Sequence, residues 1–112
     1  MSAEIADVLD SAADLIERDG WIGDVDSGAS VPVSAMCVQV ACSQSTESFP
    51  LSLEATYALA ASLGINVNRT QPSRCLSAVW EWNDTPGRTE QEVLAALRRA
   101  AKNERSKDDG VA

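Results

Sequence analysis

The sequence predicts an all-α protein, a single compact bundle of four to five helices, and three observations support this. Apolar residues recur at intervals of three and four over several long segments. Glycine or proline stands where most of these segments end. A chain of 112 residues suits one domain that buries roughly two thirds of its unfolded surface. We therefore expect one helical domain over residues 1–103 and a polar, frayed tail over residues 104–112.

The first half of the chain predicts two helices. One runs over residues 2–19, with Ser2 as its N-cap and Gly20 as its terminator. Its expected inward residues are Ile5, Val8, Leu9, Ala12, Ala13 and Ile16. A polar loop over residues 23–30 follows. Ser34 is a candidate cap for a short helix ending at Ala41, although the alternating valines of residues 31–40 also fit a strand.

The second half predicts three further helices. After a loop over residues 44–50, one helix is expected over residues 53–63, capped by Ser52 and ended by Gly64. Its apolar stripe comprises Leu53, Tyr57, Ala60 and Ala61. After a loop over residues 65–72, another helix is expected over residues 73–82. There Trp80 and Trp82 point in nearly opposite directions, so both are buried only if this helix is central, which is the arrangement we expect. Otherwise an indole, Trp82 in our prediction, anchors a partner.

The turn between the last two helices carries the clearest local signals. Pro86 fixes its own φ and disfavours the helical region for Thr85, so the preceding helix should end at Asn83 or Asp84. Gly87 then supplies the conformational freedom that such a turn often needs.

The last helix follows this turn directly. Thr89 and Glu92 have the spacing of a capping box, in which each side chain satisfies a free backbone N–H at the helix start. Arg88 is expected to pair with Asp84 or with a carboxylate of the helix. The predicted buried stripe comprises Val93, Leu94, Leu97, Ala100 and Ala101.

These features resemble a family of small proteins of unknown function from actinobacteria and the phages that infect them, of the mycobacteriophage type. The matching features are a helix ending in Gly20-Trp21, a cysteine-containing apolar segment over residues 36–41, and a Trp-Asn-Asp, Pro-Gly-Arg-Thr signature over residues 82–89. The resemblance extends to about Lys102. It departs at Val40, where members often carry glycine. It implies a source and no activity.

Charge is concentrated at the N-terminal end. The first 30 residues hold eight acids against Arg18 alone, and so carry almost all of the net charge of −8. Five acids share one face of the first helix: Glu4, Asp7, Asp10, Asp14 and Glu17. Three explanations compete. The face is solvated, or it docks on a basic surface of a partner or on Arg98, Arg99 and Lys102 of a neighbouring copy, or it imitates a nucleic-acid backbone.

Several chemistries find no support in the sequence. Without histidine no Ser-His-Asp or Cys-His arrangement can form, and there is no P-loop. Cys37, Cys42 and Cys75 include no Cys-x-x-Cys pair, and we expect no metal and no cofactor. We expect the three thiols to be buried and inert, and the alternative is that one of them is reactive. Asp84 as a base and Arg88 as an anion clamp remain as an alternative polar site.

The expected function is a non-catalytic protein–protein interaction module, a phage accessory protein that binds a host factor. The alternatives are an acidic regulator that inhibits a DNA-binding protein and an enzyme of unfamiliar type at Asp84 and Arg88. Self-association is left open. A sequence pI near 4.3 disfavours direct nucleic-acid binding. With no long apolar run and no recognisable secretory signal, a cytoplasmic location without membrane contact is expected.

Overall fold

The predicted all-α class is confirmed in the computed structural model, which describes residues 2–23 and 34–109, with side chains up to residue 107. Over these ranges the chain forms five helices and no strand. They are α1 (Ser2–Asp19), α2 (Val38–Gln44), α3 (Phe49–Ser62), α4 (Pro72–Asn83) and α5 (Glu90–Asp109).

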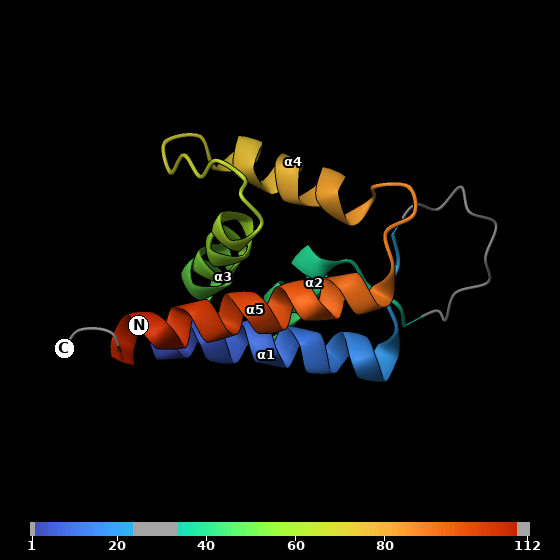
Figure 1. Cartoon of the computed structure of the whole chain (residues 1–112), viewed down its shortest axis with the longest axis horizontal. Helices are drawn as coiled ribbons and strands as arrows, with labels where there is room; N and C mark the ends of the chain where they lie inside the picture. The colour runs from blue at the N-terminus through green and yellow to red at the C-terminus, as the bar shows by residue number, and fades with distance from the viewer. Residues whose placement is uncertain (1, 24–33, 110–112) are drawn as a thin grey trace.

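The core is built on a pair of long helices, α1 and α5, which lie side by side and run in opposite directions (Figure 1). All six predicted inward residues of α1 are buried, and so are the five of α5. Several of them are alanines, and small side chains let two helices approach closely. This pair makes the most extensive contact between any two helices.

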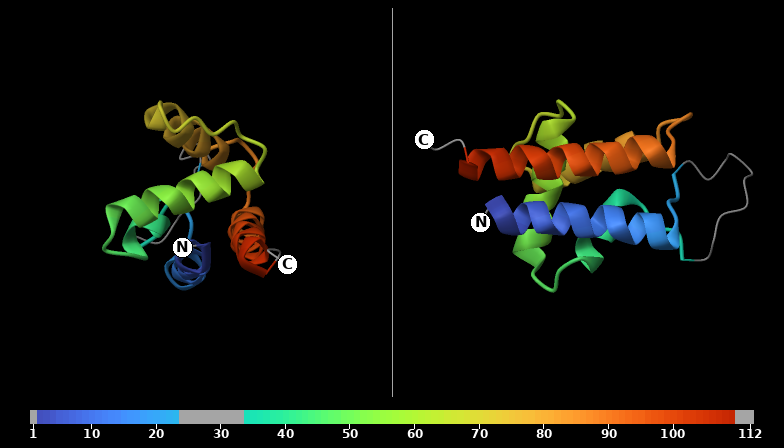
Figure 2. Two further views of the ribbon diagram at one scale, coloured as in Figure 1. Left: turned by 90° about the vertical axis from the view of Figure 1, so that its left-hand side faces the viewer. Right: turned by 60° about the horizontal axis from the view of Figure 1, so that its bottom comes forward.

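The other helices build outward from this pair. α3 crosses it, and α4 lies on the far side of α3 (Figure 2). α2 is short and contacts α1, α3 and α4. α4 packs mainly on α2 and α3, through Cys75 and Val79. It is therefore a peripheral helix, with one side that none of the described helices covers.

Two helices begin elsewhere than predicted. α2 starts at Val38, four residues after the predicted cap Ser34, whose Oγ instead donates to the Asp19 carbonyl. The alternative of a strand within residues 31–40 is not observed in the described part of this segment, where the β-structure is one isolated bridge between Trp21 and Met36. Val31, Val33 and the predicted loop beyond Gly23 lie outside the described residues.

α3 begins at Phe49, inside the predicted loop over residues 44–50. Ser48, and not Ser52, is its N-cap, and its Oγ accepts a hydrogen bond from the Leu51 N–H at 3.2 Å. Pro50 is tolerated there because the first turn of a helix does not use its N–H groups. Ala61 of the predicted stripe is exposed. Gly64 ends the helix with a φ of 79°, as predicted.

The last helix is longer than expected. α5 continues to Asp109, so the domain boundary predicted at residue 103 lies within it. Glu104, placed in the polar tail, is 5% exposed and pairs with Lys107 at 3.1 Å. Residues 110–112 lie outside the described residues. Within residues 2–23 and 34–109, no helix is both long and apolar enough to span a membrane.

Candidate functional site

Asn83, the last residue of α4, is fully buried and joins three segments of the chain. Its Oδ1 accepts from the Trp21 indole at 2.7 Å and from the Val38 N–H at 3.1 Å. Its Nδ2 donates to the Ile22 carbonyl and to Asp84 Oδ1, both at 3.0 Å. The bond to Val38 caps α2, whose own N-cap residue makes no side-chain bond. The sequence assigned Asn83 only to the end of a helix.

Gly23 completes this junction by leaving space. A Cβ at this position would lie 2.4 Å from the Trp21 ring and 3.0 Å from the Asn83 carbonyl oxygen. The distances leave no room for a side chain between the indole and the end of α4. The Gly-Trp segment after α1 and the end of α4 are therefore in direct contact.

The turn after α4 is held by Arg88. Its guanidinium lies 4.3 Å from the centroid of the Trp82 ring, its Nε donates to the Trp82 carbonyl, and it pairs with Glu92 at 3.0 Å. Of the two partners expected for Arg88, the helix carboxylate is the one observed. Trp82 is half-buried beneath it, which leaves little of the indole for a partner.

The remaining turn residues have the predicted local roles. Gly87 has a φ of 84°, a left-handed conformation that favours glycine. Thr89 and Glu92 form the capping box, with both backbone bonds at 3.2 Å. Thr85 and Pro86, which precede Gly87, are exposed.

The alternative catalytic pair is not assembled. Asp84 accepts from Asn83, while Arg88 is engaged by Trp82 and Glu92, and no described contact joins Asp84 to Arg88. A base and an anion clamp need a shared space, which these two side chains do not have. Their observed contacts are those of a structural turn.

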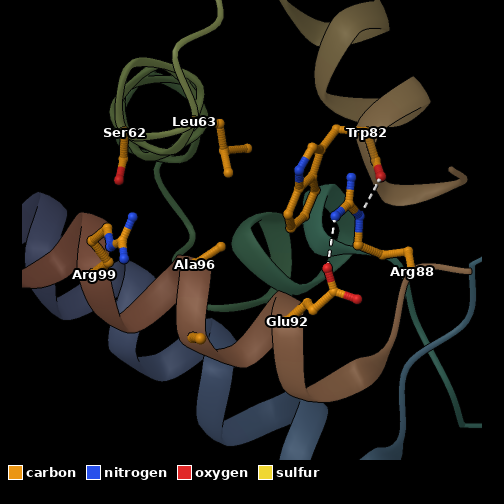
Figure 3. A pocket seen from close by; sticks show the side chains of 8 residues that line it. Ser62, Leu63, Trp82, Arg88, Glu92, Ala96 and Arg99 are labelled. Atoms are coloured by element: carbon orange, nitrogen blue, oxygen red, sulfur yellow. Dashed lines mark hydrogen bonds and ion pairs between the residues drawn. The ribbon is translucent and has the colours of Figure 1, made fainter.

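A hollow of about 290 Å³ opens beside this turn, between the C-terminal ends of α3 and α4 and the first turns of α5 (Figure 3). It forms because Ala95 and Ala96 place little bulk on that face of α5. The other lining residues are Ser62, Leu63, Trp82, Arg88, Glu92 and Arg99. Arg99 makes no ion pair with any described residue. Nothing in this lining supplies a nucleophile with a base beside it.

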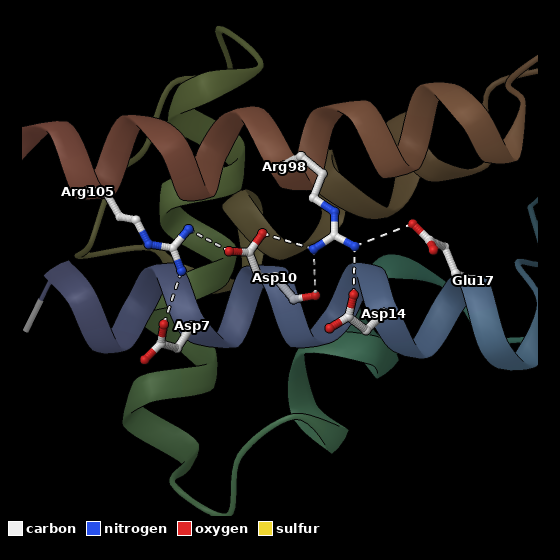
Figure 4. Close-up of polar contacts among 6 residues, drawn as sticks. All are labelled: Asp7, Asp10, Asp14, Glu17, Arg98 and Arg105. Carbon is white, nitrogen blue, oxygen red and sulfur yellow. Dashed lines mark hydrogen bonds and ion pairs between the residues drawn. The ribbon is translucent and has the colours of Figure 1, made fainter.

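The acidic row of α1 faces α5. Arg98 contacts Asp10 at 3.0 Å, Asp14 at 2.6 Å and Glu17 at 3.3 Å, and Arg105 contacts Asp7 at 3.1 Å and also Asp10 (Figure 4). Four of the five acids are thus paired within the chain. Glu4 is exposed and makes no ion pair with a described residue. The basic surface that the sequence pointed to is in the same molecule, with Arg105 in addition to Arg98.

Asp10 is the centre of this network. Burial raises the pKa of Asp10, but hydrogen bonds from Arg105 and Arg98 outweigh it, so that the pKa lies below its usual range. The hydrogen bonds that Arg98 donates to Asp14 and Asp10 likewise raise the pKa of Arg98. The carboxylate and guanidinium are therefore both held in their charged forms.

The cysteines are mostly inert. Burial raises the pKa of Cys42 to about 12, and burial also raises the pKa of Cys75. A thiol held protonated is a poor nucleophile and a poor metal ligand. Cys37 is half-buried, and the reactive-thiol alternative rests on it alone. Among the described residues no group of histidine, cysteine or acid side chains could hold a metal ion.

The uncovered side of α4 presents the most exposed tryptophan. We call it the outer face of α4, formed by Ser73, Arg74, Leu76, Ser77, Trp80 and Glu81. Trp80 is 59% exposed, so the expectation that both indoles are buried on a central helix is wrong. It borders a shallow hollow lined by all of these residues except Arg74. The exposed indole is Trp80, and not the predicted Trp82.

Two signals in the sequence were missed, one for the role of Asn83 and one for Arg105. Cys75, Val79 and Asn83 are spaced four apart and are all buried, so the apolar stripe of α4 continues onto an asparagine. Arg98 and Arg105 are spaced seven apart, which places both on the edge of α5 that meets α1. Helical spacing alone could have shown that each set of residues shares one face of its helix.

The match to known proteins covers most of the chain. Residues 1–103 match the model of a family described as Family of unknown function (DUF6197). Neither curated proteins nor solved structures gave a significant match. Because this match extends over residues 1–103 of the 112, the chain belongs to this family of unknown function.

Proposed function

We propose that the chain is a non-catalytic protein–protein interaction module that uses the outer face of α4. The supporting observation is Trp80, which is 59% exposed on a regular helix whose opposite side lies in the core. Tryptophan is enriched among the residues that dominate binding energies, because its large flat side chain buries much area at little cost in conformational entropy. A helix anchored by its inner face presents such a side chain already in position.

The two alternatives have less support. An acidic regulator needs free carboxylates, but Asp7, Asp10, Asp14 and Glu17 are paired with arginines of α5. An enzyme needs a convergent polar site, and the contacts of Asp84 and Arg88 serve the turn instead. The interaction module requires neither.

In line with the family resemblance of the sequence, we propose further that the chain is a phage accessory protein and that its partner is a host factor. The partner surface should be apolar at its centre and able to pair with Arg74 and Glu81 at its edge, since these charges share one edge of the outer face of α4. Interfaces commonly combine such an apolar centre with a polar rim.

The test is affinity capture from an actinobacterial lysate with the tagged wild-type chain, Trp80→Ser and Phe49→Ser. Phe49 is 75% exposed at the start of α3, so its replacement removes a comparable apolar side chain from another element. We expect one host protein to be retained by wild type and by Phe49→Ser, and to bind Trp80→Ser more weakly by about 30-fold or more.

Circular dichroism of each variant would show whether the helices are intact. Equal retention by folded Trp80→Ser and wild type would contradict the proposed surface. So would equal losses in both variants, because that result would indicate nonspecific hydrophobic capture.

A further inference from the structure

We propose that the outer face of α4 pairs with the same face of a second copy of this chain, with the two helices antiparallel about a two-fold axis. The inference rests on the proposed function, because it uses the same surface: a second copy covers the outer face of α4 in the free protein, and a host factor competes with that copy for the face. It is carried by the arrangement of charge and side-chain size along α4.

The charges of the face are self-complementary. Arg74 and Glu81 lie seven residues apart, which is about two helical turns, so they project from the same edge of the face. A two-fold axis between two antiparallel helices brings this edge of one copy beside the same edge of the other copy. The residues of the two edges then run in opposite order. Arg74 of one copy is then level with Glu81 of the other, and the symmetry makes this pair twice. Parallel pairing about a two-fold axis would instead place the two edges on opposite sides of the interface and leave both pairs unmade.

Both charges are available for this contact. Arg74 and Glu81 are exposed, and neither makes an ion pair with any residue in the described part of the chain. They cannot pair with each other within α4, because seven residues of helix separate their backbones by about 10 Å. A second copy satisfies both of them at once.

The shape of the face is self-complementary as well. The same two-fold axis that aligns Arg74 with Glu81 places Trp80 of one copy level with residues 73–77 of the other. Ser73 and Ser77 leave room there, and Leu76 provides an apolar contact beside them. Each indole would thus fill the shallow hollow of the opposite copy and lose its exposed apolar area.

Long-range electrostatics permit pairing at this face. The net charge of −8 opposes self-association in general. However, α4 carries one basic and one acidic residue, and it lies on the side of α3 away from α1 (Figure 2). Antiparallel pairing through α4 therefore keeps the two acidic rows on opposite sides of the dimer.

Sedimentation equilibrium of the full chain over a range of concentrations tests this arrangement. We expect a reversible monomer–dimer equilibrium for wild type. Arg74→Glu and Glu81→Arg should each weaken the dimer by on the order of tenfold, because each replaces two attractive pairs by two repulsive ones. The double variant Arg74→Glu with Glu81→Arg should restore wild-type association.

Lys102→Glu is the matched control. Lys102 is exposed on α5 and makes no ion pair with a described residue, so its reversal changes the net charge as Arg74→Glu does without touching α4. Dimerisation should be unchanged. Selective weakening by Lys102→Glu would overturn the proposal, since it would place the contact on α5.

The result separates this inference from the proposed function. A wild-type chain that stays monomeric at all concentrations, or a double variant that fails to recover, overturns the two-fold pairing. If Trp80→Ser then still loses a host protein that Phe49→Ser retains, the interaction module stands with another partner. If Trp80→Ser alters neither self-association nor capture, both proposals are wrong.

Discussion

At the scale of single residues, Asn83 determines how the N-terminal and C-terminal parts of the chain meet. One amide group satisfies the Trp21 indole, the first N–H of α2 and the Ile22 carbonyl. A buried donor left without a partner destabilises a protein more than the net gain from forming one hydrogen bond. The junction therefore depends on asparagine in particular, since no other side chain offers the same acceptor and donors at that length.

Replacing Asn83 by Ala should lower the free energy of unfolding by about 3 kcal/mol, because it leaves the Trp21 indole and the Val38 N–H without their acceptor. Urea unfolding followed by circular dichroism measures this. Asn103→Ala is the control, because that exposed amide makes only a 3.4 Å contact with Ser62. An equal, small loss in both variants would show that Asn83 is not the centre of the junction.

Gly87 should be needed for its backbone conformation and not for space. Its φ is 84°, and a Cβ built there meets no atom within 4 Å. Gly87→Ala should therefore cost about 1 kcal/mol of stability through the left-handed conformation alone. Gly87→Asn should cost less, because asparagine tolerates that region better. Thermal unfolding ranks the two, and the opposite order would contradict a purely conformational role.

At the scale of elements, the start of α5 is fixed by its own sequence. Thr89 and Glu92 form a reciprocal capping box, and Arg88 connects Glu92 to the end of α4. α2 shows the opposite case, because it takes its cap from Asn83, which is 45 residues away. α3 is capped locally, but by Ser48 and not by the predicted Ser52.

The capping box predicts the effect of Thr89→Ala. Loss of the hydroxyl leaves the Glu92 N–H without its acceptor and should lower the free energy of unfolding by about 1 kcal/mol. Thr89→Ser keeps the hydroxyl and should be close to wild type. Chemical unfolding measures both variants. If serine destabilises as much as alanine, then Thr89 acts through its methyl group and not as a cap.

At the scale of the whole molecule, the acidic row and the two arginines hold α1 against α5 and make stability depend on acid. The pKa of Asp10 is lowered in the folded chain. The contribution of ionised Asp10 to the free energy of unfolding is therefore fully present above the pKa of the unfolded chain, about 4. This contribution is lost as the pH falls through the lower pKa of the folded chain. Because the chain has no histidine, no imidazole titration adds a further change of stability near neutral pH.

Asp10→Asn tests this. Near neutral pH the variant should be less stable than wild type by about 1 kcal/mol, since Asp10 is only 27% exposed and contacts both arginines. At about pH 3 the difference should shrink, because protonation weakens the same contacts in wild type. Urea unfolding at both pH values measures it, with Glu47→Gln as an exposed control. A difference independent of pH would mean that Asp10 acts through packing.

The amino-acid sequence by itself determined the helical class, the buried stripes of α1 and α5, and the capped turn, because each depends on residues within one or two helical turns of one another. Only the tertiary structure decided that α4 is peripheral with Trp80 outward, that Arg98 and Arg105 neutralise the row on α1, and that Asn83 caps α2. These features join residues far apart along the chain. Helical spacing shows which side chains share a face, but not which helix that face meets.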